Sequence, residues 1–466
     1  MRIYNSLTHK KEKIIPLKNK KINIFVCGPT VYDYAHIGHA KLAIFFDIFV
    51  KYLRYKGFKV FYLQNITDID DKIIARAREK GVSPKSLALA FEKEYLKNMK
   101  YLGVNSVSKY ARATDFIEEI ISQVKRLLEK GFAYEIKNDG IYYNVAKFKN
   151  YGKLAGRTVL AAEDATSRID YSKDKKNRAD FCLWKFKQEA LEPSWPSPFG
   201  EGRPGWHIED TAITEKFFGP QYDIHGGALE LMFPHHEAEI AQMEAISGKS
   251  PMVRYWIHIG VLNVNGQKMS KSLGNFITIN EFLQRYSANH LRFFFAKNLW
   301  RSPVDYSESA MIEVVNAIEK IEEFLRKLKI QKAKPDANNI KINAWIDKLK
   351  KGFYKELDDN FNTPKAFAIM FDFIKKVNPL LDENLLSRNQ AKIIYSFFQE
   401  INKIFGLVDF KKINKNIPKK IRDLAKEREF CRKNKDWQRA DQLRKEIEKE
   451  GFVVEDTKDG PLIKII

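Results

Sequence analysis

The chain has 466 residues, which is too long for one ordinary domain of about 100–200 residues, so we expect a large catalytic unit with appended modules. Hydrophobic residues make up 44% of it, yet no segment approaches the roughly 18 apolar residues of a membrane helix and the first residues lack a secretory-signal pattern, which predicts a cytoplasmic protein without membrane contact. Three scattered cysteines exclude a disulfide framework, and a net charge of +22 favours a nucleic-acid partner over a merely solvated lysine-rich surface.

The first part of the chain alternates short strand-like segments with helical patterns. Ile22–Val26 and Val60–Leu63 predict strands, and Ala40–Tyr55 between them has the apolar spacing of a helix. This order predicts an α/β class with a doubly wound parallel sheet, a Rossmann-type catalytic domain over residues 1–310, with chemistry at the carboxyl ends of the strands. Clusters of Gly, Pro and charged residues at about 131–204 indicate an insertion between the two halves of the sheet.

The last third of the chain predicts two further modules. Amphipathic helical patterns over residues 311–410, separated at Pro335, Pro364 and Pro379, indicate a helical bundle. Residues 418–466 follow a basic linker and predict a charged helix pair with two short strands, which is a small C-terminal α+β domain.

Two short motifs lie on opposite halves of the predicted sheet. His-Ile-Gly-His at 36–39 lies between the first strand and its helix, where amide groups and imidazoles can meet an anion, although a metal or capping role fits it equally well. Lys268 and Lys271 lie in a polar loop, residues 268–272, that could follow a leaving pyrophosphate or be an ordinary basic turn.

The two motifs in this order resemble those of class I aminoacyl-tRNA synthetases. The resemblance implies that His36, His39, Lys268 and Lys271 are catalytic, and that His36, Gly38, His39 and Lys271 bind ATP together with Mg²⁺. Such donors stabilise negative charge that develops at the α-phosphate. A Gly-x-x-x-x-Gly-Lys-Ser/Thr loop is absent from the sequence, which argues against a P-loop nucleotidase.

A third set of residues is similar to the cysteinyl-tRNA synthetase family. Cys27 directly follows the first strand, and His235 and Glu239 have the i, i+4 spacing of one helix face, with Pro234 at the expected first helical position. The likeness runs nearly end to end. Its other segments include residues 65–72, 111–114, 222–227 and 358–364.

The resemblance implies one zinc ion held by Cys27, Asp210, His235 and Glu239, and a substrate thiolate that binds this zinc. Zinc prefers thiolate to a neutral hydroxyl, so it would separate cysteine from serine. The family has cysteine where this chain has Asp210. Either Asp210 is a ligand of equal formal charge, or the metal is weak, different or absent; the three remaining ligands favour the first interpretation.

The same resemblance implies residues for the amino-acid pocket. Thr67, Trp206 and His207 match positions that bind the substrate, with further histidines at 225, 236 and 258 as a polar floor. In the C-terminal helix pair, Trp437 among basic residues could meet an anticodon base, or the pair could be an exposed, salt-bridged surface.

The sequence therefore predicts a cysteine–tRNA ligase, acting as a monomer on L-cysteine, ATP and tRNA(Cys). One rival is a cysteine:amino-sugar ligase of the same family, which would not need the modules after residue 310. The other is a non-catalytic RNA-binding paralogue, against which the presence of His36, His39 and Lys271 argues.

Overall fold

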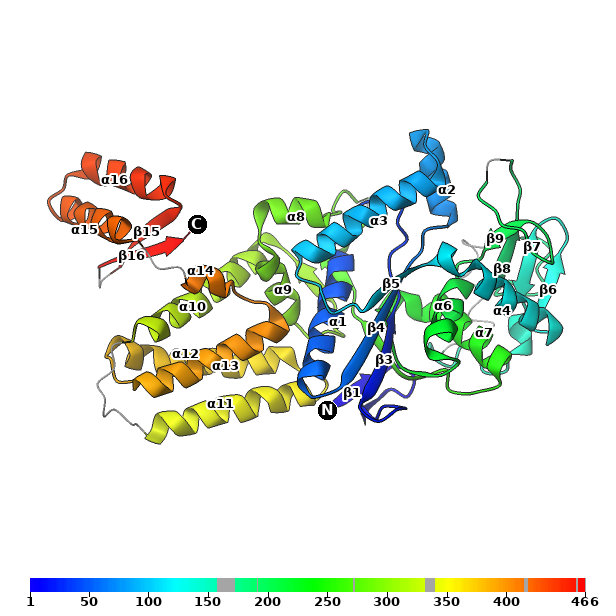
Figure 1. Cartoon of the computed structure of the whole chain (residues 1–466), viewed down its shortest axis with the longest axis horizontal. Helices are drawn as coiled ribbons and strands as arrows, with labels where there is room; N and C mark the ends of the chain where they lie inside the picture. The colour runs from blue at the N-terminus through cyan, green and yellow to red at the C-terminus, as the bar shows by residue number, and fades with distance from the viewer. Residues whose placement is uncertain are drawn as a thin grey trace.

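The computed structural model of the chain describes residues 1–156, 172–190, 192–270, 273–331, 340–414, 418–457 and 460–465. Lys271 of the predicted lysine loop and Pro335 of the predicted helical bundle lie outside these residues. Figure 1 shows an antiparallel insertion and a helical bundle on opposite sides of a central sheet, with a small unit at the C-terminus. This arrangement confirms the predicted α/β fold class with its insertion and helical module.

The central sheet has five parallel strands in the order β11-β10-β3-β4-β5. Their bounds are β3 Lys21–Val26, β4 Lys59–Ile66, β5 Lys109–Arg112, β10 Tyr222–Ala228 and β11 Val253–Ile259. Along the chain, this sheet begins with β3 and is extended through β4 to β5, and the chain later returns to add β10 on the other side of β3. Strand order therefore reverses between β3 and β10, which is where open α/β sheets bind their ligands.

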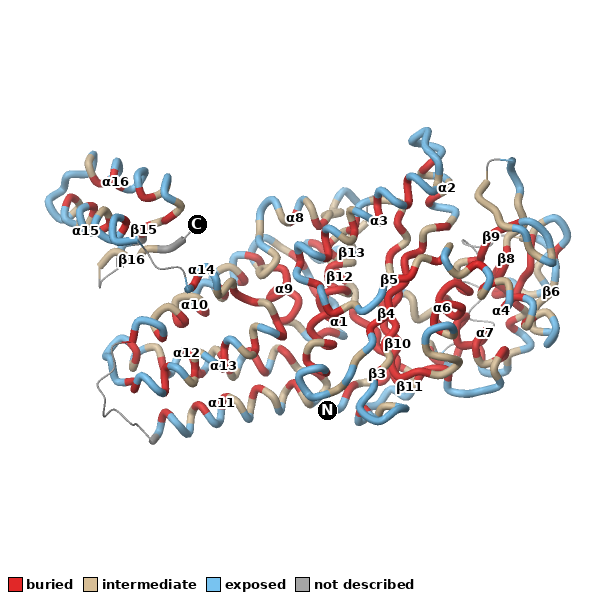
Figure 2. The backbone as a smooth tube through the Cα atoms, in the orientation of Figure 1, coloured by how far each residue is buried: buried red, intermediate tan, exposed pale blue. Residues whose placement is uncertain are grey.

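Helix α1, Ile37–Tyr55, begins earlier than the sequence predicted because the histidine motif forms its first turn. The His36 side chain caps the helix by accepting a hydrogen bond from the Gly38 backbone N–H at 3.0 Å. Helix α1 is buried on almost all sides, and Ile44, Phe46 and Phe49 belong to the main hydrophobic core. Packing against the sheet thus fixes the direction in which the motif points (Figures 1 and 2).

Several helices complete the catalytic unit. They are α2 Asp71–Lys80, α3 Pro84–Tyr101, α4 Ile117–Glu129, α6 Ile208–Phe218, α7 Glu237–Ser247, α8 Ile279–Arg285 and α9 Ala288–Ala296. Helix α3 was not predicted, although Ser83 caps it and Pro84 occupies its first turn, which is a readable start signal.

The insertion forms its own antiparallel sheet in the order β6-β7-β8-β9. Its strands are β6 Ala133–Ile136, β7 Gly140–Tyr143, β8 Phe181–Phe186 and β9 Gly202–Pro204. Side chains of β7 and β8 share a hydrophobic cluster with α4, α6 and α7, so the insertion is anchored to the helix that precedes it and to the two helices that follow it. A smaller sheet, β13-β12-β14, contains β12 Leu262–Val264, β13 Gln267–Lys268 and β14 Val304–Tyr306, while β1 Arg2–Asn5 pairs with β2 Lys10–Lys13.

The helical bundle contains α10 Glu308–Ile330, α11 Ile340–Asp358, α12 Thr363–Asp382, α13 Arg388–Phe405 and α14 Phe410–Asn414. Pro364 lies in the first turn of α12, as expected for a helix start. The predicted break at Pro379 is wrong, because this proline lies inside α12. Its ring removes one backbone hydrogen bond, and the helix ends three residues later, at Asp382.

The C-terminal unit pairs α15 Lys419–Lys433 with α16 Trp437–Lys449 and ends in the hairpin of β15 Phe452–Thr457 and β16 Gly460–Ile465. The Arg428 guanidinium donates to both carboxylate oxygens of Asp456, at 2.7 and 3.1 Å, and so ties α15 to the hairpin. Among the described helices, none is long and apolar enough to cross a membrane.

Candidate active site

A cavity of about 530 Å³ opens at the carboxyl ends of β3, β10 and β11. His36, Gly38 and His39 line it from α1, and Lys268 lines it from β13. Cys27 and Trp206 belong to the same wall. The structure therefore places both predicted motifs, and part of the predicted metal site, around one space large enough for a small ligand.

The rings of the two motif histidines lie against each other, with centroids 3.9 Å apart and planes inclined by 34°. Gly38 lies so close to them that a Cβ atom there would be 2.8 Å from the His36 ring, so only glycine fits. Burial lowers the pKa of His39 to about 4. His39 is therefore a neutral imidazole at physiological pH, able to donate one hydrogen bond without adding positive charge.

The loop that carries the predicted lysines is held by hydrogen bonds at its two ends. Ser270 N–H donates to Asn275 Oδ1 at 2.8 Å, and Asn275 Nδ2 donates to the Lys268 carbonyl at 3.2 Å. The Lys268 ammonium forms an ion pair with Glu230 across the cavity mouth, and both side chains are exposed, by 70% and 53%. Lys271 lies outside the described residues, so its role remains a prediction.

The four predicted metal ligands converge beneath this cavity. Donor atoms of Cys27, Asp210, His235 and Glu239 all lie within 4.8 Å of one another, and all four residues are buried. His235 Nε2 is 3.0 Å from Asp210 Oδ2 and 3.1 Å from Glu239 Oε1. One thiol, one imidazole and two carboxyl groups form a donor set that a divalent cation can use.

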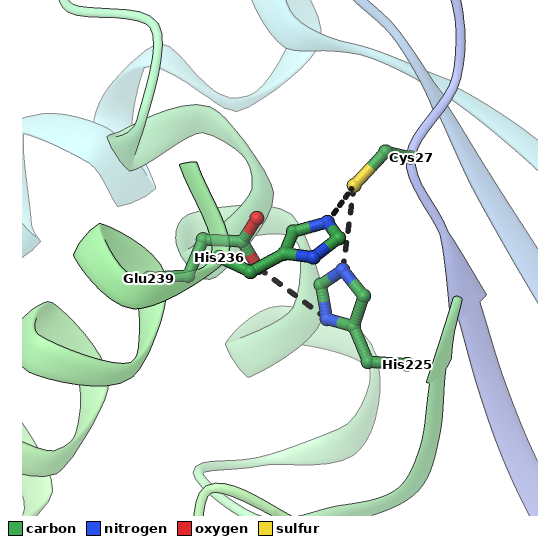
Figure 3. Close-up of side chains that lie close together, drawn as sticks. All are labelled: Cys27, His225, His236 and Glu239. Carbon is green, nitrogen blue, oxygen red and sulfur yellow. Dashed lines mark hydrogen bonds and ion pairs between the residues drawn. The ribbon is translucent and has the colours of Figure 1, made fainter. Parts of the chain in front are cut away.

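A second possible donor set overlaps the first. His225 and His236 join Cys27 and Glu239 in a group whose donor atoms also lie within 4.8 Å of one another (Figure 3). Cys27 Sγ is 3.1 Å from His236 Nε2 and 3.3 Å from His225 Nε2. These histidines were predicted only as part of a polar floor, yet the structure places them in direct contact with the cysteine sulfur.

The acidic groups of the candidate metal site would be stabilised by a positive charge. Burial, reinforced by Asp210 and Glu239, raises the pKa of the Cys27 thiol well above its usual value. Burial and Asp210 likewise raise the pKa of Glu239. Asp210 Oδ1 has no hydrogen-bond partner among the residues that the structure describes, and the two Glu239 oxygens lie 3.1 and 3.3 Å from imidazole nitrogens of His235 and His225 without hydrogen-bond geometry. Buried acceptors without partners are costly, and a bound cation would satisfy them.

The surrounding histidines favour ligation over charge repulsion. Burial lowers the pKa values of His207, His225 and His236 well below 6.5, and that of His258 to about 3. Neutral imidazoles can act as ligands or hydrogen-bond partners beside a cation, whereas charged ones would repel it.

The four candidate metal ligands come from four separate elements of the fold. Cys27 follows β3, with its N–H bonded to the Gly226 carbonyl at 3.1 Å, and Asp210 lies in the first turn of α6. Glu239 lies in the first turn of α7, and His235 precedes that helix in the short turn Met232–His236.

The backbone of Phe233, with φ −137° and ψ 133°, is extended and interrupts the helical path. The helical path resumes at Pro234, in agreement with its predicted place as the first helical residue, and continues through His236 into α7, which is bounded at Glu237. His235 and Glu239 meet because this turn runs directly into α7.

The predicted amino-acid pocket residues surround this cluster. The Trp206 ring lines the cavity and stacks on His235, with centroids 4.3 Å apart. Thr67 and His207 are buried behind it: Thr67 Oγ1 donates to Glu209 at 2.9 Å, and His207 Nδ1 is 2.9 Å from His235 Nδ1. Only Trp206 of the three reaches the cavity, while the other two support its neighbours.

Comparison with known proteins places this geometry in a family. The model described as tRNA synthetases class I (C) catalytic domain matches residues 13–316, a DALR domain matches 352–409, and a cysteinyl-tRNA ligase anticodon binding domain matches 415–461. A cysteine–tRNA ligase of Thermococcus gammatolerans is 42% identical over all of this chain and 99% of its own length. The chain belongs to the cysteinyl-tRNA synthetase family.

Further relatives agree with this assignment. A cysteine–tRNA ligase of Thermodesulfovibrio yellowstonii is 41% identical over 100% of this chain and 99% of its own length. A cysteine–tRNA ligase of Thermoplasma volcanium is 43% identical over 98% of each chain. The fold is also similar to Mycobacterium tuberculosis methionyl-tRNA synthetase bound by methionyl-adenylate. That structure matches with a TM-score of 0.65 over 84% of this chain and 93% of its own, at 13% identity.

One buried residue of this cysteinyl-tRNA synthetase family member was missed by sequence reasoning. The Lys41 ammonium, on α1 two residues after the histidine motif, donates to the carbonyls of Gly260, Val261 and Ser302 at 2.7, 3.0 and 3.3 Å. Burial lowers the pKa of Lys41 to about 7. A lysine on the apolar face of a predicted helix was the available signal, because a charge is rarely buried without partners.

Proposed function

We propose that the protein is a cysteine–tRNA ligase that activates L-cysteine with ATP and transfers it to the 3′ end of tRNA(Cys). The observation that carries this proposal is the shared cavity, in which the histidine motif and Cys27 line one space. A family member of this length with both features can bring ATP and an amino acid together.

The first step joins the cysteine carboxylate to the α-phosphate. Attack on phosphorus forms the acyl–phosphate bond and breaks the bond to the β-phosphate oxygen, which releases pyrophosphate. His36 and His39 would donate hydrogen bonds to the reacting phosphate, and Lys268 and Lys271 would stabilise the charge that leaves with pyrophosphate. Mg²⁺ would accompany ATP at the same site. In the second step the 3′-terminal ribose hydroxyl attacks the carbonyl carbon and AMP leaves.

Zinc fits the buried donor set of Cys27, Asp210, His235 and Glu239. The unpartnered Asp210 Oδ1, the fully buried Glu239 carboxylate and the raised pKa of the Cys27 thiol support a bound cation at this position. When bound, zinc would supply a site that accepts the substrate thiolate and rejects the hydroxyl of serine. Trp206 would close the pocket beside it, and Thr67 and His207 would hold its walls.

Asp210 stands where the family has cysteine, and we propose that it is a true ligand. A carboxylate carries the same formal charge as a thiolate, and its zinc–oxygen bond of about 2.0–2.2 Å is shorter than the zinc–sulfur bond of about 2.3 Å. Its Oδ2 lies 3.0 Å from His235 Nε2, and its Oδ1 has no hydrogen-bond partner among the described residues. An oxygen-rich set would bind zinc less tightly than the usual two thiolates and make it a harder Lewis acid.

The remaining modules support the choice of tRNA as the acceptor. We assign residues 1–310 to catalysis, 311–410 to contacts on the anticodon side of the tRNA and 418–466 to the anticodon itself. The net charge of +22 supports a polyanionic partner of this size. A monomer located in the cytoplasm is the expected working form.

Two assays on one preparation test this function against its rivals. Cysteine-dependent exchange of pyrophosphate into ATP should occur without tRNA, and tRNA(Cys) should then accept labelled cysteine. A cysteine:amino-sugar ligase would show the exchange but no charging of tRNA. A non-catalytic RNA-binding paralogue would bind tRNA and show neither reaction, so each rival predicts a distinct pair of results.

A further inference from the structure

A second cavity, of about 410 Å³, lies between α3, the loop after β4 and the insertion. The strand β4 and its loop border both cavities: Gln64 lines the active-site cavity, and Asp68 lines the second one. The two spaces therefore flank the same short segment at the carboxyl edge of the sheet. The volume is within the range of small-molecule sites and suits one nucleotide rather than a duplex.

One end of this cavity carries two cations, Arg112 and Lys85, beside the carboxylates of Asp68, Glu92 and Asp115. The Arg112 Nε donates to both carboxylate oxygens of Glu92, at 2.8 and 3.0 Å, and Glu92 is buried. This pair orients the guanidinium, while its two terminal nitrogens have no hydrogen-bond partner within the described part of the chain. Lys85, exposed in the first turn of α3, adds a second positive charge at the rim. A guanidinium with a free edge is well suited to phosphate oxygens.

The other walls are apolar and aromatic. Trp195 is fixed by two backbone hydrogen bonds to Gly202, at 2.7 and 3.0 Å, and Leu89 is 43% exposed on the facing helix. Asp115 adds an exposed carboxylate to the lining. An aromatic wall for a planar ring, a carboxylate that can accept from an exocyclic amine and cations for a phosphate are the features that bind an unpaired nucleotide.

We propose that this second cavity binds one nucleotide of the unpaired 3′ end of the tRNA, next to the terminal nucleotide that enters the active site. The inference rests on the proposed function, because it assumes a tRNA acceptor. It assigns to the insertion, through Trp195, and to α3, through Leu89, a role in guiding the acceptor end past Asp68 into the active-site cavity.

The test uses Leu89→Asp, which removes the apolar wall and places a negative charge inside the cavity. The matched control is Ala90→Asp, which adds the same charge at the next exposed position of α3, outside the cavity lining. Cysteine-dependent pyrophosphate exchange, with its KM for ATP, should match the wild type in both variants. With full-length tRNA, kcat/KM for charging should fall between about fivefold and a hundredfold in Leu89→Asp, as for loss of one stacked base, and stay unchanged in Ala90→Asp.

A tRNA that lacks its unpaired 3′ nucleotides separates the acceptor end from the rest of the molecule. Its Kd should be the same for Leu89→Asp and the wild type. Equal weakening of truncated and full-length tRNA would overturn the proposal, as would equal charging by the two variants. A raised KM for ATP would instead show a free-nucleotide site and would also overturn it. Wild-type protein that fails to charge tRNA at all would remove the proposed function itself, which is a separate outcome.

Discussion

The floor and the mouth of the active-site cavity are built in opposite ways. At the floor, Cys27, Asp210 and Glu239 are almost fully buried, and their donor atoms lie within 4.8 Å of one another. At the mouth, Lys268 and Glu230 form an ion pair between two largely exposed side chains. Buried polar groups are costly to leave unpaired, whereas exposed ion pairs contribute about 0–1 kcal/mol. Recognition of the amino acid should therefore depend strongly on the floor, and the mouth should tolerate change.

The largest effect is expected from Asp210→Ala at the floor. Loss of one of four donors should lower the affinity for zinc by about 100-fold or more and reduce pyrophosphate exchange to a similar extent, equivalent to ~2.7 kcal/mol in barrier height. Metal affinity is measured by competition with a chelator of known strength. The matched variant Asp210→Cys should keep the metal, because thiolate is a better zinc ligand than carboxylate.

Unchanged metal affinity in Asp210→Ala would contradict this assignment. It would show that His225 and His236 complete the site with Cys27 and Glu239, as the second donor set allows.

A smaller effect is expected from Lys41→Met, between floor and mouth. Its ammonium joins the helix of the histidine motif to Gly260 and Val261, which line the cavity at the end of β11. Loss of these bonds should raise the KM for ATP about five- to tenfold, or ~1–1.4 kcal/mol, with little change in the KM for cysteine. Lys41→Arg keeps the charge and should recover most of the loss. Equal changes in both KM values would show a general structural defect instead.

Glu230→Gln at the mouth should have an effect of about twofold or less on the KM for ATP, since it breaks only an exposed ion pair. The measurement is steady-state pyrophosphate exchange, with Glu189→Gln as the control because Glu189 also pairs on the surface, with Arg78. A tenfold change in the KM for ATP would show that the mouth of the cavity is as sensitive to substitution as its floor.

The smallest effect concerns pH. Burial lowers the pKa of His39 to about 4, so its ring gains a proton only as pH falls toward 4. Between pH 7 and pH 5, where an ordinary histidine with a pKa near 6.5 becomes charged, His39 should show no titration. Ring chemical shifts measured by NMR, assigned with His39→Asn, check this. A midpoint near 6.5 would contradict the buried, neutral imidazole.

Much of the fold and part of the site were predictable from the sequence. The strand and helix around the histidine motif follow from local spacing, and the family resemblance identified Cys27 and Glu239 as partners. The contacts of Lys41 and of His225 were not predictable, because they form only when α1 packs on the end of β11 and when β10 pairs with β3. Local sequence patterns predict individual helices and strands, whereas contacts between elements that are distant in sequence can be assigned only once the strand order of the sheet is known.

The central claim is that the buried floor holds a metal that captures the substrate sulfur. Replacement of zinc by Co²⁺ gives an optical readout, because each thiolate that binds cobalt adds a charge-transfer absorption. We expect one Co²⁺ per chain, with absorption from Cys27 alone before substrate, a clear increase on adding cysteine and none on adding serine. A protein that binds no stoichiometric metal, or whose spectrum ignores cysteine, would contradict this account.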